Sequence, residues 1–334
     1  MMLMHPVTGA VFALLAAGCS STMARREPAG PPHDRTSHFE YAATVTGLPA
    51  QAKSVRIWVP LPRTDEAQTI SNLKVESPVP HRETRETLYG NRIAYFEIAG
   101  PCPDQVPIKV SFDAHRFEVT AMKRRTGGPA HARFLEGDRL APLGGEVAAR
   151  ASQATQGKGT VMEKARGIYD RVLSDVAYDK TGQGWGRGDI KYVCEVGKGN
   201  CSDFHALFIS MARAEKIPAL FEIGFPLPLD KTEGVVGGYH CWAWFQEKEG
   251  VWRPVDASEA DKDPSRKDYF FGTLCCNRVA LSRGRDLVLE PAQAGEPLNF
   301  FIYPYVEVDG KPVEVGVEKR FAFRDLGAAP ARAD

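Results

Sequence analysis

The stretch GNCSDFHALF, Gly199–Phe208, places a cysteine at the point where a loop gives way to a buried helix. The apolar residues from Phe204 to Met211 recur at the spacing of one helix face. The glycines and the asparagine before Cys201 are typical of a loop that leads into a helix. We therefore predict that Cys201 opens a buried helix.

A cysteine at a helix start has two interpretations. Unpaired backbone N–H groups and the helix dipole favour the thiolate, which is the reactive form of the side chain. The backbone N–H of Cys201 could also donate to a developing oxyanion. Taken alone, however, such a cysteine is more often a small core residue. The chemical interpretation therefore depends on partners elsewhere in the chain.

Two polar residues downstream supply those partners. His240 starts an aromatic strand, Asp256 closes the next strand, and residues 247–250 form an obvious turn between them. The chain thus presents an imidazole and a carboxylate on one hairpin. With Cys201 as nucleophile, His240 as base and Asp256 as the group that orients the histidine, this is the arrangement of an activated thiol.

The hairpin register decides whether the two side chains can meet. Side chains alternate along each strand, so His240 and Asp256 share a face only if paired positions have an even sum. A three-residue loop satisfies this by pairing Glu247 with Val251, with Gly250 in the left-handed conformation. A bulge that restores the same parity is equivalent.

Strand patterns precede the helix and follow it. Between residues 37 and 122, short alternating runs separated by proline and glycine predict a β-sandwich domain. The alternating apolar residues include Phe39, Tyr41, Ala43, Val45, Val55, Ile57 and Val59. After a mixed, glycine-rich boundary region, helices and then strands predict a second domain over residues 150–325. A helix packed on an antiparallel sheet makes the fold class α+β.

The N-terminus predicts export. Residues 7–17 are almost all apolar, but the segment is shorter than the roughly 20 apolar residues of a membrane-spanning helix. It ends in LAAGC, Leu15–Cys19, which resembles a bacterial lipobox. That resemblance implies a signal peptide over residues 1–18, acylation of Cys19, a flexible tether over residues 19–36 and attachment to the periplasmic face of the cell envelope. The alternative is an ordinary cleaved signal with an incidental cysteine.

Composition argues against nucleic acid as a partner and limits how many cysteines can form disulfides. The 42 Lys and Arg residues balance the 42 Asp and Glu residues, so no net basic field favours nucleic acid. Of seven cysteines, the lipid-bearing Cys19 and the nucleophile leave five, an odd number that cannot pair completely. The adjacent Cys275 and Cys276 leave a strained vicinal disulfide conceivable beside the alternative of two free or separately paired thiols.

Residues from about 160 to 275 resemble the core domain of the transglutaminase-like superfamily. The matching segments are 199–204, 213–219, 240–242 and 252–256. The resemblance implies a papain-like triad at Cys201, His240 and Asp256, in a helix-and-sheet core that needs no cofactor. Residues 55–62 also resemble the β-domain that precedes this core in bacterial members. The departures are Lys216, where glycine is usual, and Cys241, where a small residue such as alanine is common.

Other candidate groups have competing interpretations. A zinc site could be drawn from Cys194, Cys201, His205, His240 and Cys241. The helical spacing of Cys201 and His205, and the expected opposite faces of His240 and Cys241, argue against it, so we predict no metal. His205 is expected to pack beneath the nucleophile. Trp185, on a glycine-rich loop, is either an oxyanion donor that lines the cleft or a cap on the core.

These observations favour a thiol-dependent enzyme that hydrolyses a protein or peptide amide through an acyl-enzyme. Transamidation, in which an amine replaces water, uses the same three residues and is not separable from hydrolysis at this level. The third alternative is a non-catalytic envelope module that uses the cleft for recognition. The retention of all three polar side chains argues for an enzyme.

Overall fold

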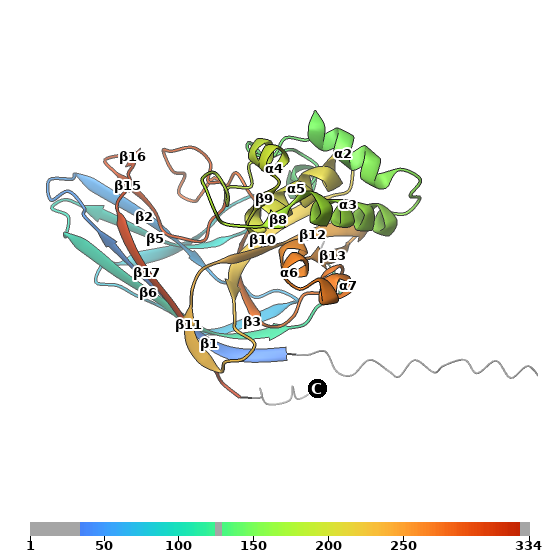
Figure 1. Ribbon diagram of the computed structural model, residues 1–334. Helices are drawn as coiled ribbons and strands as arrows, with labels where there is room; N and C mark the ends of the chain where they lie inside the picture. The colour runs from blue at the N-terminus through green and yellow to red at the C-terminus, as the bar shows by residue number, and fades with distance from the viewer. Residues whose placement is uncertain (1–33, 124–128, 328–334) are drawn as a thin grey trace, which may run out of the picture. The chain divides into compact units, whose positions relative to one another are not determined.

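The computed structural model describes residues 34–123 and 129–327, in which three five-stranded sheets provide the framework (Figure 1). The expected signal peptide, Cys19 and the tether as far as residue 33 lie outside the described residues. Within the described part of the chain, no helix combines the length and the apolar character that a membrane span requires.

Two of the sheets form the predicted β-sandwich. The first has the order β11 (Glu233–Val236), β17 (Gly316–Asp325), β1 (Asp34–Thr46), β6 (Gln105–Phe117) and β3 (Gln68–Glu76). The second has the order β16 (Lys311–Pro312), β15 (Tyr305–Val308), β2 (Ser54–Leu61), β5 (Arg92–Ala99) and β4 (His81–Arg85). Alternate residues of β1, β2 and β6 are buried in one shared core, which confirms the alternation found in the sequence.

The expected domain boundary at the C-terminal side is wrong. Strands β15, β16 and β17 fall inside the range 150–325 assigned to the second domain, yet they complete the two sandwich sheets. β1 pairs with β6 on one edge and with β17 on the other, from Ser37 opposite Asp325 to Thr46 opposite Gly316. Alternation in a sequence shows which face of a strand is buried but not which strand lies beside it.

The ordered body also begins earlier than expected. β1 starts at Asp34, inside the tether predicted over residues 19–36. Arg35 donates from Nε to Asp325 Oδ1 at 2.9 Å and from Nη1 to Asn277 Oδ1 at 2.8 Å. A polar segment without apolar periodicity is typical of a linker, but pairing with β6 satisfies its backbone groups.

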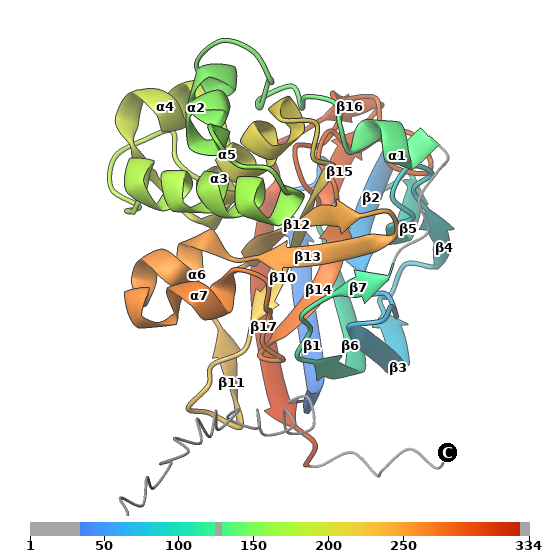
Figure 2. The ribbon, with the colours of Figure 1, turned by 90° about the vertical axis from the view of Figure 1, so that its right-hand side faces the viewer.

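The third sheet and its helices form the α+β core. The strand order is β14 (Arg278–Arg283), β10 (Ala219–Pro226), β12 (His240–Lys248), β13 (Val251–Val255) and β7 (Met122–Lys123). The central helix is α5 (Cys201–Ala214), and around it lie α2 (Glu146–Thr155), α3 (Val161–Asp175) and α4 (Ile190–Val196) (Figure 2). Helix α5 is buried from Cys201 to Arg213 and packs on β12, with the Phe208 and Phe245 rings 6.1 Å apart.

Smaller elements complete the core. These are α1 (Pro129–Arg133), the parallel pair β8 (Ala177–Tyr178) and β9 (Lys198–Gly199), α6 (Ala257–Lys262), η1 (Pro264–Arg266) and α7 (Lys267–Phe270). Helix α2 begins four residues before the expected domain start at 150, and Asp138 Oδ2 accepts from Arg213 Nη1 at 3.0 Å. The region between the two expected domains therefore packs against α5 and is part of the core.

Candidate active site

The N-terminus of α5 is held by two reciprocal hydrogen bonds. Asn200 is the N-cap, and its Oδ1 accepts from the backbone N–H of Ser202 at 2.8 Å. Asp203 Oδ2 accepts from the backbone N–H of Asn200 at 2.8 Å, which completes a capping box. Cys201 is thus the first helical residue, as predicted, and its side chain is buried with 2% exposure.

Asp203 also fastens the glycine-rich loop to the helix. Its carboxylate accepts from the backbone N–H of Gly186 at 2.6 Å and of Gly188 at 2.9 Å. Gly188 has a φ of +59°, and a Cβ there would lie 2.8 Å from Ala206 Cβ. Only glycine allows this close approach, so the loop is fixed directly over the first turns of α5.

The hairpin register has the predicted parity, in its bulged form. Ala243 pairs with Val255 and Gln246 with Trp252, and Glu247 is then bypassed because Lys248 pairs with Val251. Continuing this register places Asp256 opposite Trp242, on the face of His240. The simple pairing of Glu247 with Val251 does not occur. Gly250 adopts the expected left-handed conformation, with φ of 73°.

The structure brings Cys201, His240 and Asp256 together. His240 Nε2 lies 2.8 Å from Asp256 Oδ2, and the interaction of the imidazole with Cys201 lowers the pKa of the thiol. Because Nε2 is used by the carboxylate, Nδ1 is the nitrogen available to sulfur. Asp256 is itself fixed as the N-cap of α6, where Oδ1 accepts from the backbone N–H of Glu259 at 3.2 Å.

The electrostatics favour a thiolate–imidazolium pair. Burial alone would raise the pKa of Cys201, but hydrogen bonds from Cys241 and His240 and the charge of His240 lower it well below its usual value. Burial opposes charge on His240 too, yet Asp256 and Cys201 raise its pKa to about 10. Burial would raise the pKa of Asp256, but His240 and Arg278 hold it well below its usual range.

Arg278 is a site residue that sequence reasoning missed. Its Nη1 donates to Asp256 Oδ2 at 2.9 Å, so the arginine shares one carboxylate oxygen with His240. The side chain is 3% exposed, and its Cζ lies 4.8 Å from the ring centre of Trp242. Nothing in the residues around position 278 signals this contact, because it arises from the pairing of β14 with β10.

His205 and Cys241 line the side of the site that faces α5. His205 is fully buried, and its Nε2 accepts from the backbone N–H of Ala257 at 3.1 Å. Burial lowers its pKa to about 4, so it is neutral and packs as expected. The expected separation of His240 and Cys241 agrees with the packing of β12. Cys241 lies in the core cluster with α5, whereas the His240 ring lies 6.0 Å from that of Trp242, which belongs to a different cluster. His240 is the first residue of β12, where the strand ends beside α5.

Three tyrosines surround the buried thiol. Burial raises the pKa values of Tyr178, Tyr239 and Tyr303, and negative charge on Cys201 raises them further. The hydroxyl of Tyr239 accepts from Asn200 Nδ2 at 3.1 Å and lies 3.2 Å from Ser202 Oγ. These contacts connect the strand end that carries His240 to the start of α5.

Trp185 uses its indole N–H within its own loop. Nε1 donates to the Gly182 carbonyl oxygen at 3.2 Å, and the residue is half-buried. An oxyanion role would require this bond to break. Among the described residues, no group of three or more histidine, cysteine, aspartate or glutamate side chains is placed to hold a metal ion. The five residues of the zinc alternative therefore form no such group.

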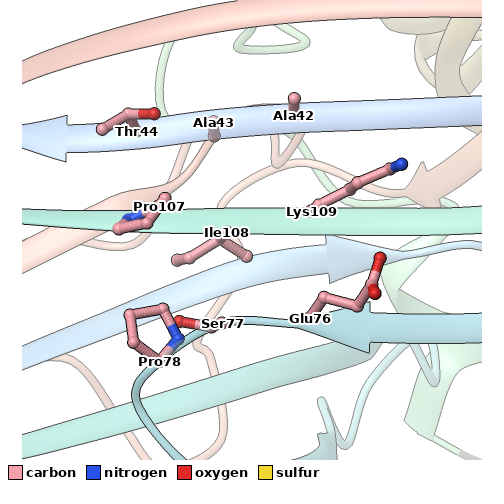
Figure 3. Close-up of a pocket in the computed structure, with 9 residues that line it drawn as sticks. All are labelled: Ala42, Ala43, Thr44, Glu76, Ser77, Pro78, Pro107, Ile108 and Lys109. Atoms are coloured by element: carbon pink, nitrogen blue, oxygen red, sulfur yellow. The ribbon is translucent and has the colours of Figure 1, made fainter.

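The remaining cysteines and the hollow on the sandwich lie apart from the three residues of the site. All six cysteines in the described ranges are free, so Cys275 and Cys276 are not joined. A hollow of about 460 Å³ on β1, β6 and β3 is lined by Ala42, Ala43, Thr44, Glu76, Ser77, Pro78, Pro107, Ile108 and Lys109 (Figure 3). This lining contains no cysteine or histidine, so the hollow is separate in chemistry from the Cys201 site.

Replacing His240 with alanine should move the pH dependence of Cys201 alkylation. In the native protein the thiolate forms well below the usual thiol pKa, so the iodoacetamide rate should reach its plateau at correspondingly low pH. Without the imidazolium, burial dominates and the inflection should shift upward by at least one unit. Rates measured from pH 4 to 10 by mass spectrometry of the Cys201 peptide test this. Coincident profiles would contradict the ion pair.

The raised pKa of His240 also has a consequence for stability. The folded value of about 10 exceeds the unfolded value of 6.5, so the interaction contributes stability fully below pH 6.5 and loses it as the pH rises through 10. The difference in unfolding free energy between the native protein and the His240→Ala variant should therefore shrink on the alkaline side. Urea titrations at pH 6 and pH 10.5 measure it.

Comparisons with known proteins cover the part of the chain that carries this site. Residues 148–257, which include Cys201, His240 and Asp256, match the model of the transglutaminase-like superfamily. The match is confined to these residues, so it identifies a transglutaminase-like core domain within the chain. The crystal structure of a candidate cysteine protease from Cytophaga hutchinsonii covers 91% of this chain and 95% of its own, with a TM-score of 0.56 and 14% identity, which shows a shared fold.

Two other proteins are similar over a smaller part of the chain or with a lower TM-score. An uncharacterised protein of Haemophilus influenzae is 30% identical over 194 residues, which are 48% of this chain and 53% of that protein. The match thus spans about half the length of that relative. The periplasmic domain of TgpA from Pseudomonas aeruginosa covers 67% of this chain and 77% of its own, with 16% identity and a TM-score of 0.33.

Proposed function

We propose that this protein hydrolyses an amide bond in a protein or peptide through a covalent thioester on Cys201. The observation that carries the proposal is the chain of interactions from thiol to imidazole to carboxylate. His240 lowers the pKa of Cys201, and its Nε2 lies 2.8 Å from Asp256 Oδ2. The match of residues 148–257 to the transglutaminase-like superfamily supports the same chemistry.

The residues divide the reaction into two steps. The Cys201 thiolate attacks the amide carbonyl carbon, and the backbone N–H of Cys201 at the start of α5 stabilises the oxyanion. The His240 imidazolium then gives its proton to the departing amine, which leaves an acyl group on sulfur. In the second step neutral His240 takes a proton from water, which attacks the thioester and restores the thiolate. Asp256 keeps the ring oriented and stabilises its charged form.

The enclosure of the thiol requires that substrate entry move side chains. Cys201 is 2% exposed, and the half-buried tyrosines around it are the residues that an incoming peptide must displace. Tyr239 is bonded both to Asn200 and to the Ser202 hydroxyl, so its displacement would open the start of α5 directly.

Incubation in oxygen-isotope-labelled water distinguishes hydrolysis from transamidation and from binding without catalysis. The protein should be incubated with a panel of peptides in this water, with and without a fluorescent primary amine. Hydrolysis places heavy oxygen in a new carboxylate, whereas transamidation incorporates the amine instead. A binding module does neither. Heavy oxygen that appears with the native protein and not with Cys201→Ala supports the proposal, and the absence of any product across the panel counts against it.

We further propose a location at the periplasmic face of the cell envelope, held by a lipid on Cys19. The support is the LAAGC motif of the sequence, which lies outside the described residues. Replacing Cys19 with serine should release the protein from the membrane fraction, because one diacyl-modified cysteine supplies the anchor. Fractionation of cells that express each form measures this. A variant that remains in the membrane fraction would refute lipidation as the anchor.

A further inference from the structure

A second thiol lies against the first turn of the nucleophile helix. Cys241 Sγ is 3.6 Å from His205 Nδ1 and 3.8 Å from Ser202 Oγ. Those two residues follow Cys201 by four positions and by one, so they flank it on the same turn of α5. The Cys241 side chain is fully buried, and each of the two thiols is among the causes that shift the pKa of the other. Cys241 therefore faces the turn of α5 that carries Cys201.

The two thiols differ in their protonation. Cys201 is held as a thiolate by the hydrogen bonds and charge described above. Burial raises the pKa of Cys241, and the neighbouring Cys201 thiolate raises it well above its usual value. Cys241 is therefore a protonated thiol, and its S–H donates to Ser202 Oγ at 3.8 Å, beside the Cys201 thiolate. A low-pKa cysteine beside a second cysteine is the arrangement in which oxidation of the first is resolved by the second.

We infer that Cys201 and Cys241 form a redox-active pair, which a hydroperoxide converts to a disulfide across the start of α5 and β12. The Cys201 thiolate attacks one peroxide oxygen, the O–O bond breaks, and hydroxide leaves while Cys201 becomes a sulfenic acid. The Cys241 sulfur then attacks the Cys201 sulfur, the S–O bond breaks, and the released hydroxide takes the Cys241 proton as water. The two sulfurs are oxidised and the peroxide is reduced.

The disulfide would have two consequences for the site. It removes the nucleophile, so amide chemistry stops until a thiol reductant restores both cysteines. It also prevents the further oxidation of Cys201 to sulfinic and sulfonic acids, which thiols do not reverse. The inference does not depend on the proposed amide hydrolysis, because the sulfur chemistry requires only the neighbouring thiols and a small oxidant that reaches a buried site.

The other cysteines provide controls within the same chain. Cys194 lies on α4 and is partly exposed, and burial raises its pKa, so it lacks the activation of Cys201. Replacing Cys241 with serine keeps a hydroxyl donor near Ser202 and His205 but cannot form a disulfide. Cys241→Ala is the second variant, since the family tolerates a small residue there, and Cys194→Ser is the matched control.

The test is mass spectrometry of each reduced protein after treatment with hydrogen peroxide, followed by dithiothreitol. The native protein and Cys194→Ser should lose two hydrogen atoms, yield a peptide pair linking Cys201 to Cys241, and return to the reduced mass. Cys241→Ser and Cys241→Ala should instead gain two or three oxygen atoms on Cys201 that dithiothreitol leaves in place. This readout requires no amide substrate, so it fails or succeeds independently of the proposed function.

Two results would overturn the inference. One is oxygen addition to Cys201 in the native protein to the same extent as in the Cys241 variants, without a linked peptide pair. The other is a disulfide from Cys201 to a different cysteine. Since the native protein alone shows or lacks the linked pair, the inference remains testable even if a Cys241 variant does not fold.

Discussion

Replacing Cys201 with alanine is expected to abolish amide turnover while the fold persists. Loss of a covalent nucleophile in an enzyme of this kind lowers kcat by roughly 10⁶. Alanine is a good helix former, and Asn200 and Asp203 cap α5 without help from the Cys201 side chain. We therefore expect the thermal unfolding midpoint to change by only a few degrees. Peptide hydrolysis and circular dichroism measured on the same sample test both parts.

The matched control for this experiment is Cys194→Ala. Cys194 lies on α4, two elements away from α5 in the chain, and it belongs to none of the contacts around His240. Its replacement should leave kcat within about twofold of the native value. Turnover that survives in Cys201→Ala, or that falls equally in both variants, would show that the thiol of Cys201 is not the nucleophile.

The second large effect is expected from Asp256→Asn. An amide in place of the carboxylate favours the wrong tautomer of His240 and no longer stabilises its charge, which costs about 10⁴ in kcat in a comparable triad. The same change leaves the buried Arg278 without its charged partner at 2.9 Å. Breaking a buried ion pair costs about 3–5 kcal/mol, so the variant should also be less stable.

Asp261→Asn separates the catalytic effect from a general effect on α6. Asp261 accepts from the backbone N–H of Tyr178 at 2.9 Å and lies on the same helix as the Asp256 cap, one turn further on. Its replacement should cost little in kcat. Urea titration and peptide hydrolysis on both variants measure the two effects. An unchanged kcat in Asp256→Asn would remove the carboxylate from the mechanism.

The sequence predicted those parts of the site that depend on one helix or strand, or on two that are adjacent in the chain. The spacing from Phe204 to Met211 predicted the buried helix, and glycines with an asparagine marked its start. The parity rule predicted that His240 and Asp256 share a face, and the structure satisfies it by bypassing Glu247. Helix caps, turns and strand alternation are short-range properties, which is why they are visible in one chain.

The parts that escaped prediction depend on contacts between distant segments. β17 joins β1 across most of the chain, so the division into two consecutive domains failed. Arg278 reaches Asp256 only because β14 lies beside β10, and Cys241 reaches the first turn of α5 only because β12 packs on that helix. The residues of the capping box, Asn200 and Asp203, are visible in the sequence. The hydrogen bond from the Gly186 backbone N–H to Asp203 could not be predicted from it.

Detection of an acyl group on Cys201 tests the central claim most directly. The native protein should be mixed with a panel of acyl nitroanilides, quenched in acid within the first turnover, and digested for mass spectrometry. We predict an acyl adduct on the peptide that contains Cys201, removable by hydroxylamine and absent from Cys201→Ala. Release of nitroaniline with no adduct at Cys201, or with undiminished rate in the alanine variant, would contradict the account.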